Sequence, residues 1–361
     1  MDIADTLEIN RILAKAKQTG ASDTHLSVGR PPMFRLYGDL KPQEDWNILT
    51  PEDTKKLCQE MMNERFKSMV EKNGEVDFSY EISNVGRYRV NVFKQKGTYS
   101  AAIRTINSQI LSLEQLSLPP VLAELCKKPR GMVLVTGPTG SGKTTTLAAM
   151  IDLINREQKR HILTLEDPIE FIHMHKNSIV NQREIGTDSQ SFAGALRAGL
   201  RQDPDVILVG EMRDIETISI AVTAAETGHL VFATLHTSSA AQTVERIIDV
   251  FPPHQQPQIR VQLAAAIQGI VSQTLVNRID KQGRIAAVEV LIGTPAIRNL
   301  IREGKTHQIN SMIQTGGQYG MQTLEASFKK LFLAGIVSPE SAAVNGINLN
   351  GFTKENNTQL Y

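Results

Sequence analysis

The sequence predicts an α/β nucleotide-binding core that follows a small α+β domain, and three observations support this prediction. Residues 133–146, VLVTGPTGSGKTTT, hold a glycine-rich phosphate-binding motif between an apolar run and a helix signal. Short apolar runs alternate with helical patterns over 132–235, as in a parallel sheet covered on both faces. Alternation of apolar and polar residues over 76–92 indicates half-buried antiparallel strands.

Length and composition are those of a globular protein of about two or three domains. The chain has 361 residues, of which 41% are hydrophobic and 21% charged. A net charge of +1 and 5% aromatic residues give no general sign of nucleic-acid binding. The isolated Cys58 and Cys126 form neither a zinc motif nor a disulfide framework. No apolar run could span a bilayer and the start is acidic, so we expect a cytoplasmic protein.

Residues 1–112 are predicted to form the small α+β domain. Apolar residues at helical spacing in 9–16 indicate a first helix. A second helix is predicted from the capping pair Thr50-Pro51 to Asn73-Gly74. Two alternating strands are predicted after it, over 76–82 and 88–92, and 100–106 is a third strand candidate.

The second of these strands carries Arg87, Arg89 and Asn91 on the face opposite its apolar residues, because side chains alternate along a strand. A solvated polar face is the ordinary interpretation of such a pattern. Arg104 lies in the third strand. Two consecutive prolines then indicate a stiff connector, and we place the linker at 113–120.

The motif GPTGSGKT has the spacing of a phosphate-binding loop. Its glycines let the backbone amides point inward, and the helix that follows adds its positive N-terminal end. Lys143 is expected to reach the β- and γ-phosphates, and the Thr144 hydroxyl to ligate Mg²⁺. A glycine-rich turn without a ligand is the alternative, but strand and helix signals flank the motif on the correct sides. The predicted nucleotide-binding residues are Gly137, Pro138, Thr139, Gly140, Ser141, Gly142, Lys143, Thr144 and Thr145.

Acidic residues follow two of the apolar runs where each run ends. Glu166, Asp167 and Glu170 come after the run 162–165, and Glu211 comes after 206–209. The carboxyl ends of parallel strands share one edge of a sheet, where phosphate chemistry takes place. Acids at that edge hold Mg²⁺ or position the attacking water. We therefore predict Glu166, Glu170 and Glu211 as catalytic residues, and Asp167 and Glu211 as Mg²⁺ ligands beside Thr144.

Two histidines bracket the apolar run 230–235. His236 follows the run, and we predict that it senses the γ-phosphate by donating a hydrogen bond. His229 precedes the run and is a second catalytic candidate. A fully extended strand would hold the two side chains roughly 20 Å apart, too far for one metal ion. His173 and His175 resemble a metal pair, but we expect an exposed turn there.

The last third of the chain is predicted to be mainly helical and to complete a second domain over 121–345. An apolar stripe over 263–276 indicates one or two helices. A compact helix with proline at its start and glycine at its stop is predicted over 295–303, where Arg298 and Arg302 share a polar face. The polar tail 346–361 is expected to be poorly ordered.

Together these motifs resemble the secretion ATPase superfamily and, within it, the type IV pilus retraction ATPases. The phosphate loop corresponds to the Walker A motif of that family. Its Asp box, Walker B and His box correspond to LTLEDPIEF at 163–171, DPDVILVGEMRD at 203–214 and GHLVFATLHT at 228–237. AIRNLIRE at 296–303 matches the retraction signature in full. The tetracysteine zinc insertion of the extension and type II secretion relatives is not found in this sequence.

The resemblance implies a RecA-like P-loop ATPase core preceded by a PAS-like domain, with ATP and Mg²⁺ as cofactors. It implies that Glu211 polarises the attacking water and that Glu166, Asp167 and Glu170 help to arrange Mg²⁺ and water. It also implies that Arg89 and Arg104 reach the nucleotide, although the choice among these and Arg87 stays open.

The same resemblance implies a homo-hexameric motor for pilus retraction and twitching motility at the inner face of the cytoplasmic membrane. An inner-membrane platform protein and a paralogous retraction ATPase are the implied partners. Two alternatives stay open. One is an accessory ATP-binding subunit of the retraction machine, and the other is a RecA-like nucleic-acid translocase, which the near-neutral charge disfavours.

Overall fold

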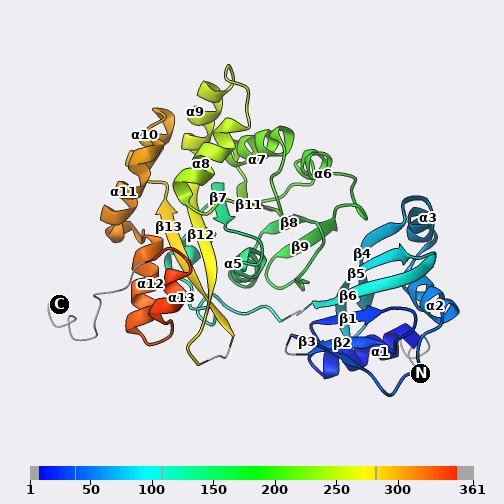
Figure 1. Ribbon diagram of the computed structural model, residues 1–361. Coiled ribbons are helices and arrows are strands. Elements are labelled where there is room, and N and C mark those ends of the chain that lie inside the picture. The colour runs from blue at the N-terminus through cyan, green and yellow to red at the C-terminus, as the bar shows by residue number, and fades with distance from the viewer. Residues whose placement is uncertain (1–7, 37, 107–108, 281–282, 348–361) are drawn as a thin grey trace. The chain divides into compact units, whose positions relative to one another are not determined.

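The computed structural model describes residues 8–36, 38–106, 109–280 and 283–347. The chain divides into two compact units (Figure 1). The first comprises Met1–Gln109 and Pro168–Ile172, and the second comprises Ile110–Asp167 and His173–Tyr361. The short segment Pro168–Ile172 therefore belongs to the first unit, although both of its flanks belong to the second. Most of the predicted tail, 348–361, lies outside the described residues.

The first unit is built on a six-stranded antiparallel sheet with strand order β3-β2-β1-β6-β5-β4. Helices cover one of its faces, and their apolar side chains form a single core with the strands. The strands are β1 (Asp23–Leu26), β2 (Met33–Leu36), β3 (Asp39–Pro42), β4 (Glu75–Ile82), β5 (Gly86–Gln95) and β6 (Thr98–Ile106), and the helices are α1 (Glu8–Gln18), α2 (Pro51–Met61) and α3 (Glu64–Asn73).

The single helix predicted after Thr50 is two helices, α2 and α3, which are separated at Met62 and Asn63. The prediction was therefore wrong about the continuity of the helix. Thr50 caps α2 as expected, in a reciprocal pair of bonds with Asp53. At Met62 the backbone is extended, and the Asn63 side chain then caps α3 by accepting a hydrogen bond from the Phe66 amide. The break arises because Asn63 caps a new helix. The apolar pattern on either side of Asn63 gives no sign of it.

The second unit is built on a seven-stranded sheet with order β13-β12-β7-β11-β10-β8-β9. All neighbours in this sheet are parallel except β12 and β13. Its strands are β7 (Gly131–Thr136), β8 (His161–Glu166), β9 (Ile179–Glu184), β10 (Val206–Val209), β11 (Leu230–Leu235), β12 (Ile267–Asn277) and β13 (Arg284–Ile292).

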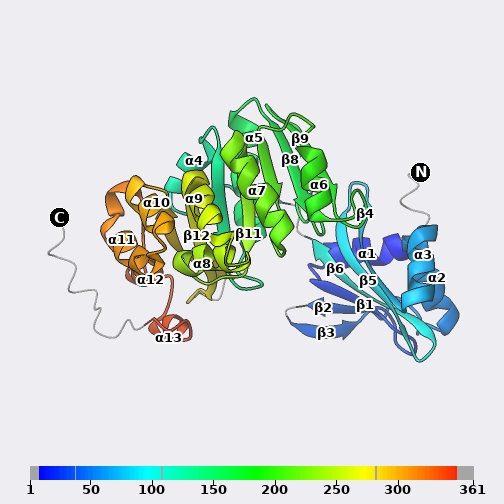
Figure 2. The same cartoon turned by 90° about the horizontal axis from the view of Figure 1, so that it is seen from above.

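Helices cover both faces of this sheet. Val133 and Val135 of β7 face a cluster with α4 and α5, whereas Met132 and Leu134 face α7, α8 and α9. Helices α10, α11 and α12 lie together beyond β12 (Figure 2). The helices are α4 (Val121–Cys126), α5 (Lys143–Glu157), α6 (Phe192–Gly199), α7 (Ile215–Thr227), α8 (Ala240–Asp249), α9 (Gln256–Ala266), α10 (Pro295–Arg302), η2 (Thr306–Gln308), α11 (Ile309–Thr315), η3 (Gly317–Tyr319), α12 (Leu324–Leu333) and α13 (Pro339–Ala343).

The helical prediction for 263–276 was wrong over most of its length. Helix α9 ends at Ala266, and the chain then continues directly into strand β12. This strand lies between β7 and β13 and is buried over most of its length. A strand buried on both faces has no polar alternation, so its apolar run looks the same as one face of a buried helix. Strand β9 was not predicted at all.

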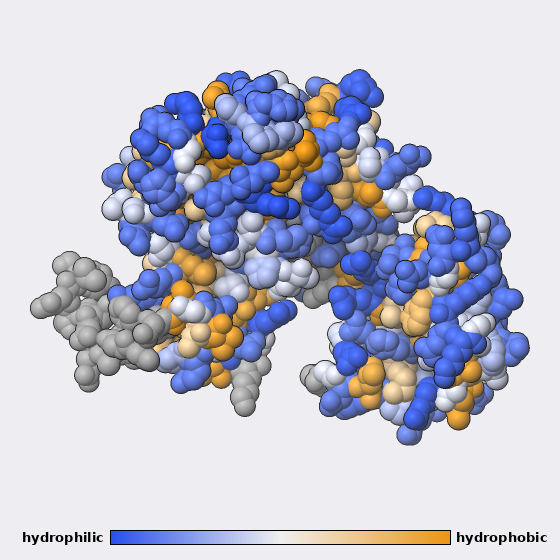
Figure 3. All heavy atoms as spheres, turned by 45° about the horizontal axis from the view of Figure 1, so that its top comes forward, coloured by the Kyte–Doolittle hydropathy of each residue, from blue (hydrophilic) through white to orange (hydrophobic). Residues whose placement is uncertain are grey.

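Among the residues that the structure describes, no helix is both long and apolar enough to cross a membrane. Hydrophilic residues predominate on the face of the molecule shown in Figure 3. Large apolar side chains that are exposed are spread along the sequence, from Leu40 to Val344.

Candidate nucleotide-binding site

The phosphate-binding motif lies at the end of β7, between Thr136 and the start of α5. Gly137, Gly140 and Gly142 all have positive φ, at 144°, 77° and 87°, a backbone region that favours glycine. Gly137 is needed for a second reason, because a Cβ atom there would lie 2.2 Å from the carbonyl oxygen of Gln273. Pro138, Thr139 and Gly140 are exposed at the loop surface.

The loop and the first turn of α5 hold the groups that phosphate recognition needs. The Lys143 ammonium donates to the carbonyl oxygens of Gly137 and Pro138, at 2.8 and 3.0 Å. Thr144 and Thr145 are partly exposed in the first turn of α5, where amide groups without helical partners favour an anion. A lysine placed over a glycine-lined loop at a helix N-terminus fits the phosphates of a nucleotide.

Strand register brings the predicted acidic residues to the same edge of the sheet as this loop. Leu165, the residue before Glu166, is level with Val209 of β10, and Thr136 is level with Leu235 of β11. Glu211 and His236 follow those strands directly and therefore lie at the carboxyl edge, as predicted.

Glu166 is 7% exposed and is held firmly in place. Its Oε1 atom accepts a hydrogen bond from the Thr164 hydroxyl at 2.6 Å and another from the Gln182 amide at 3.2 Å. Asp167 comes next and is exposed. Of the three acids in the Asp box, Glu166 is thus buried and hydrogen-bonded, Asp167 is open to solvent, and Glu170 is half-buried.

Glu211 accepts two contacts on one carboxylate oxygen. Its Oε1 atom is 2.7 Å from Nε of Arg213 and 2.9 Å from Nε2 of His236. Burial alone would raise the pKa of Glu211, but the hydrogen bond and charge of Arg213, with a smaller contribution from His236, hold it below the usual 4.5. The bond with Glu211 raises the pKa of Arg213, and the charge of Asp167 adds to this rise. Glu211 is therefore ionised at neutral pH.

A cavity of about 320 Å³ opens beside this group of residues. Its charged and polar lining residues are Glu211, Arg213, His236, Thr237 and Arg246. No cluster of three or more His, Cys, Asp or Glu that could hold a metal ion occurs in the described part of the chain. The few oxygen ligands near the loop, from Thr144, Asp167 and Glu211, would fit a Mg²⁺ ion whose other ligands are substrate phosphates and water, as is usual for this ion.

The structure does not bring His229 to this edge. Its carbonyl oxygen accepts a hydrogen bond from the Gly131 amide at the first residue of β7, and its ring Nδ1 is 3.0 Å from the Ala224 carbonyl oxygen. His229 thus lies where the parallel strands begin. The exposed turn expected at His173 was wrong for that residue, which is buried, and burial lowers its pKa to about 4.

The first unit carries the remaining predicted residues. Arg89 of β5 lies directly opposite Arg104 of β6, and Arg104 also pairs with Asp23 at 3.1 Å. Both arginines are exposed on the sheet face opposite the core, and for Arg89 this is the face that alternation along its strand predicted. The two arginines concentrate positive charge on this face, and Asp23 offsets part of it. Glu170 is half-buried within Pro168–Ile172.

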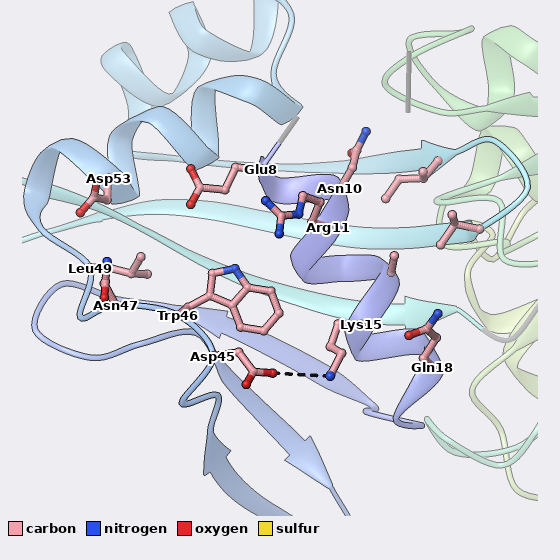
Figure 4. A pocket seen from close by; sticks show the side chains of 13 residues that line it. Glu8, Asn10, Arg11, Lys15, Gln18, Asp45, Trp46, Asn47, Leu49 and Asp53 are labelled. Carbon is pink, nitrogen blue, oxygen red and sulfur yellow. Dashed lines mark ion pairs between the residues drawn. The ribbon is translucent and has the colours of Figure 1, made fainter. Parts of the chain in front are cut away.

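A separate hollow of about 670 Å³ lies within the first unit and contains none of the predicted site residues. Figure 4 shows its walls, which come from α1 and from the loop that carries Trp46. Lys15 reaches Asp45 across it at 3.5 Å, and both side chains are largely exposed. Its charged groups are mixed in sign, so no single ligand chemistry is indicated there.

Sequence reasoning missed the residues that hold the site in place. Thr164 and Gln182 fix Glu166, Arg213 restrains Glu211, and Gln273 contacts the phosphate loop from β12. Arg213 lies within the Walker B motif and could have been considered. No local pattern marks Gln182 or Gln273, because each acts on a residue of another strand or loop, 16 residues away for Gln182 and 132 residues away for Gln273.

Comparison with known proteins agrees with this geometry. The family model described as "Type II/IV secretion system protein" matches residues 6–289. The chain is 51% identical over 336 residues to the type IV pilus retraction ATPase PilT of Pseudomonas aeruginosa, covering 93% of this chain and 97% of that one. It is also 51% identical over 311 residues to a twitching motility protein of Neisseria gonorrhoeae, covering 86% of this chain and 83% of that one.

Among solved structures, the crystal structure of the pilus retraction motor PilT with bound ADP matches with a TM-score of 0.88. The two sequences are 49% identical, and the match covers 97% of this chain and 99% of that one. The predicted fold class, an α/β P-loop core after a small α+β domain, is confirmed. The chain belongs to the type II/IV secretion system protein family.

Proposed function

We propose that this protein is an ATP-hydrolysing motor that drives type IV pilus retraction, and thereby pilus disassembly and twitching motility. The observation that carries the proposal is the shared position of the phosphate loop, Glu211 and His236 at the carboxyl edge of one parallel sheet. The similarity to retraction ATPases over most of the chain supports the biological role.

In the proposed reaction, the loop amides and Lys143 bind the β- and γ-phosphates of ATP. Thr144 would hold Mg²⁺ together with Asp167 or Glu211, and the ion would neutralise charge on the phosphate oxygens. Glu211, ionised and free of any proton, orients the attacking water. His236 already contacts that carboxylate, so a hydrogen bond from His236 to the γ-phosphate would register the nucleotide state at Glu211.

Restraint of Glu211 by Arg213 matters for this mechanism. The Arg213 guanidinium is 2.7 Å from the Oε1 atom of the carboxylate, and the arginine side chain is 74% exposed. Because solvent screens so exposed an ion pair, it contributes at most about 1 kcal/mol. Bound nucleotide can therefore compete for the arginine at little cost, which would leave the whole carboxylate available to water.

Several parts of the proposal rest on the family resemblance. Arg89 and Arg104 supply positive charge to the nucleotide, and Glu170 helps to arrange Mg²⁺ and water. The active form is a homo-hexamer at the inner face of the cytoplasmic membrane, with an inner-membrane platform protein and a paralogous retraction ATPase as partners. We also propose the domain division 1–112, 113–120 and 121–345, with the first domain PAS-like and the second RecA-like.

The test is steady-state ATP hydrolysis by full-length Glu211→Gln. We expect a fall of about 100-fold or more in kcat, because a neutral amide cannot polarise water as a carboxylate does. Glu325→Gln is the matched control, since Glu325 is exposed at the start of α12. ADP affinity should stay close to wild type in both variants. Normal ATPase activity in Glu211→Gln would refute the assignment of Glu211 as the residue that orients the attacking water.

The accessory-subunit alternative makes a different prediction for the wild-type protein. An accessory subunit would bind ATP and hydrolyse it poorly, and it would not restore retraction alone in a strain that lacks its own retraction ATPase. We expect the wild type to hydrolyse ATP and to restore twitching. The Glu211→Gln variant should hydrolyse ATP poorly and should not restore twitching.

A further inference from the structure

Strand β12 lies beside β7 and carries a buried amide against the phosphate loop. Gln273 is 3% exposed and directs both halves of its side-chain amide at this loop and its helix. Its Nε2 donates to the Ser141 carbonyl oxygen at 2.6 Å. Its Oε1 accepts from the Thr146 hydroxyl at 2.9 Å. One side chain thus joins the tip of the loop to the first turn of α5.

The backbone at the same position also contacts the loop. The Gln273 carbonyl oxygen occupies the space that a Cβ atom on Gly137 would fill, and its Nε2 would lie 3.1 Å from a Cβ atom on Gly142. One residue earlier, the Ser272 hydroxyl is 2.8 Å from that of Thr136 at the end of β7. Strand β12 therefore supports the loop from its first glycine to its last.

The bond to Ser141 has a directional consequence. A trans peptide group is planar, and its C=O and N–H point in opposite directions. Because Gln273 holds the Ser141 carbonyl toward β12, the Gly142 amide of the same peptide group points away from β12. Backbone amides of such loops bind phosphate oxygens, so the orientation of this peptide group decides whether one donor is available.

We propose that Gln273 is a positioning residue for the nucleotide phosphates. It fixes the peptide group between Ser141 and Gly142, and through Thr146 it fixes the start of α5 relative to the loop. The inference rests on the proposed nucleotide binding at this loop. A glutamine suits both contacts because its amide is a donor and an acceptor at once. A carboxylate would lose the donor and repel the Ser141 carbonyl, and a thioether would make neither bond.

Full-length Gln273→Met tests this role, because methionine keeps the length of the side chain and loses both hydrogen bonds. Gln322→Met is the matched control. Its amide also donates to a backbone carbonyl, that of Val288 at 2.9 Å, but on β13 and away from the loop. The measurements are ADP affinity by calorimetry, KM and kcat for ATP, and the melting temperature without nucleotide.

We expect Gln273→Met to weaken ADP binding about tenfold and to raise KM for ATP by a similar factor, with a smaller change in kcat. Gln322→Met should bind ADP as the wild type does. Thr146→Val removes only the second of the two bonds, that between the Thr146 hydroxyl and Gln273 Oε1, so its effect on ADP affinity should be smaller and should not add to that of Gln273→Met. Thr146→Ser keeps the hydroxyl and should retain near-normal affinity.

Wild-type affinity for ADP in Gln273→Met overturns the inference. An equal loss of affinity in Gln322→Met also overturns it, because the effect would then be one of general stability. If Gln273→Met does not fold, Thr146→Val tests the link between Gln273 and α5, and normal ADP affinity in that variant refutes the part of the role that depends on Thr146. Failure of the wild type to bind ADP would instead overturn the proposed nucleotide site itself.

Discussion

Arg298 lies in the AIRNLIRE segment, and its guanidinium donates hydrogen bonds to three backbone carbonyl oxygens of the same chain. Nε donates to the Gly293 carbonyl oxygen at 2.9 Å, Nη1 to that of Ala265 at 3.1 Å, and Nη2 to that of Ile267 at 3.0 Å. These carbonyls lie at the end of α9, the start of β12 and the end of β13. Burial lowers the pKa of Arg298 from its usual value, but the guanidinium remains charged at neutral pH. Arg298→Ala should therefore destabilise the fold.

The expected loss follows from those three bonds. A hydrogen bond from a charged donor contributes about 1.5–3 kcal/mol, but water can replace the donor at the exposed Ala265 carbonyl. Partly buried carbonyls that lose the arginine add to the loss of stability. The desolvation of the arginine in the folded wild-type protein opposes this, because the variant no longer has to desolvate a charge. We expect a net loss of about 3 kcal/mol. For a unit of this size that loss lowers Tm by roughly 6–12 °C.

Thermal unfolding of the full chain, followed by circular dichroism, measures this loss. Arg302→Ala is the control on the same helix, because Arg302 is exposed and makes only a 3.5 Å contact with Asn299. We expect this control to lie within about 0.5 kcal/mol of wild type. Equal melting of the two variants would refute the reasoning and would leave Arg298 available to a partner. Arg302→Ala is consequently the cleaner variant for a retraction assay.

Two further predictions concern the loop and a buried acid. Gly137→Ala should abolish ADP binding, because its Cβ atom would lie 2.2 Å from the Gln273 carbonyl oxygen. A Cβ atom at Gly140 meets no atom within 4 Å, so Gly140→Ala should lower the free energy of unfolding by only about 1 kcal/mol, the cost of its positive φ. Calorimetry measures ADP binding and Tm measures stability, and equal effects of the two substitutions would contradict the geometry. Burial raises the pKa of Glu289 above 4.5 despite a bond from the Ala240 amide, so its ionised form costs stability above that pH. Glu289→Gln should raise Tm at pH 8, with the gain shrinking as pH falls toward 4.5; a gain that is constant with pH would contradict this assignment.

The sequence was sufficient for the fold class and for most of the site, because both depend on local signals. The phosphate loop needs glycines at positive φ, and the acids at strand ends follow apolar runs whose parallel register places them together. The strand ends alone thus placed Glu211 and His236 at one edge. The exposed face of Arg89 followed from alternation along its strand, whereas that of Arg104 was not predicted.

Most of the failures share a physical cause, which is that long-range contacts leave no local pattern. Strand β12 is buried on both faces and resembles an apolar helix. The roles of Gln273 and Arg298 depend on carbonyl groups that other segments bring to them. His173 has the composition of a turn, but it is buried and its amide donates to the Gln182 side chain. The break between α2 and α3 depends on one cap that a continuous apolar pattern hides.

Assignment of Pro168–Ile172 to the first unit makes the protein discontinuous in sequence. The chain passes from one unit to the other after Gln109, after Asp167 and again after Ile172. Glu166 and Asp167 are therefore attached to one unit, while Glu170 of the same acidic motif is attached to the other. A fragment that ends near residue 112 would lack a piece of its own unit. The complementary fragment would carry that piece as an unpaired insertion, so the two halves should be dissected by point substitution and not by truncation.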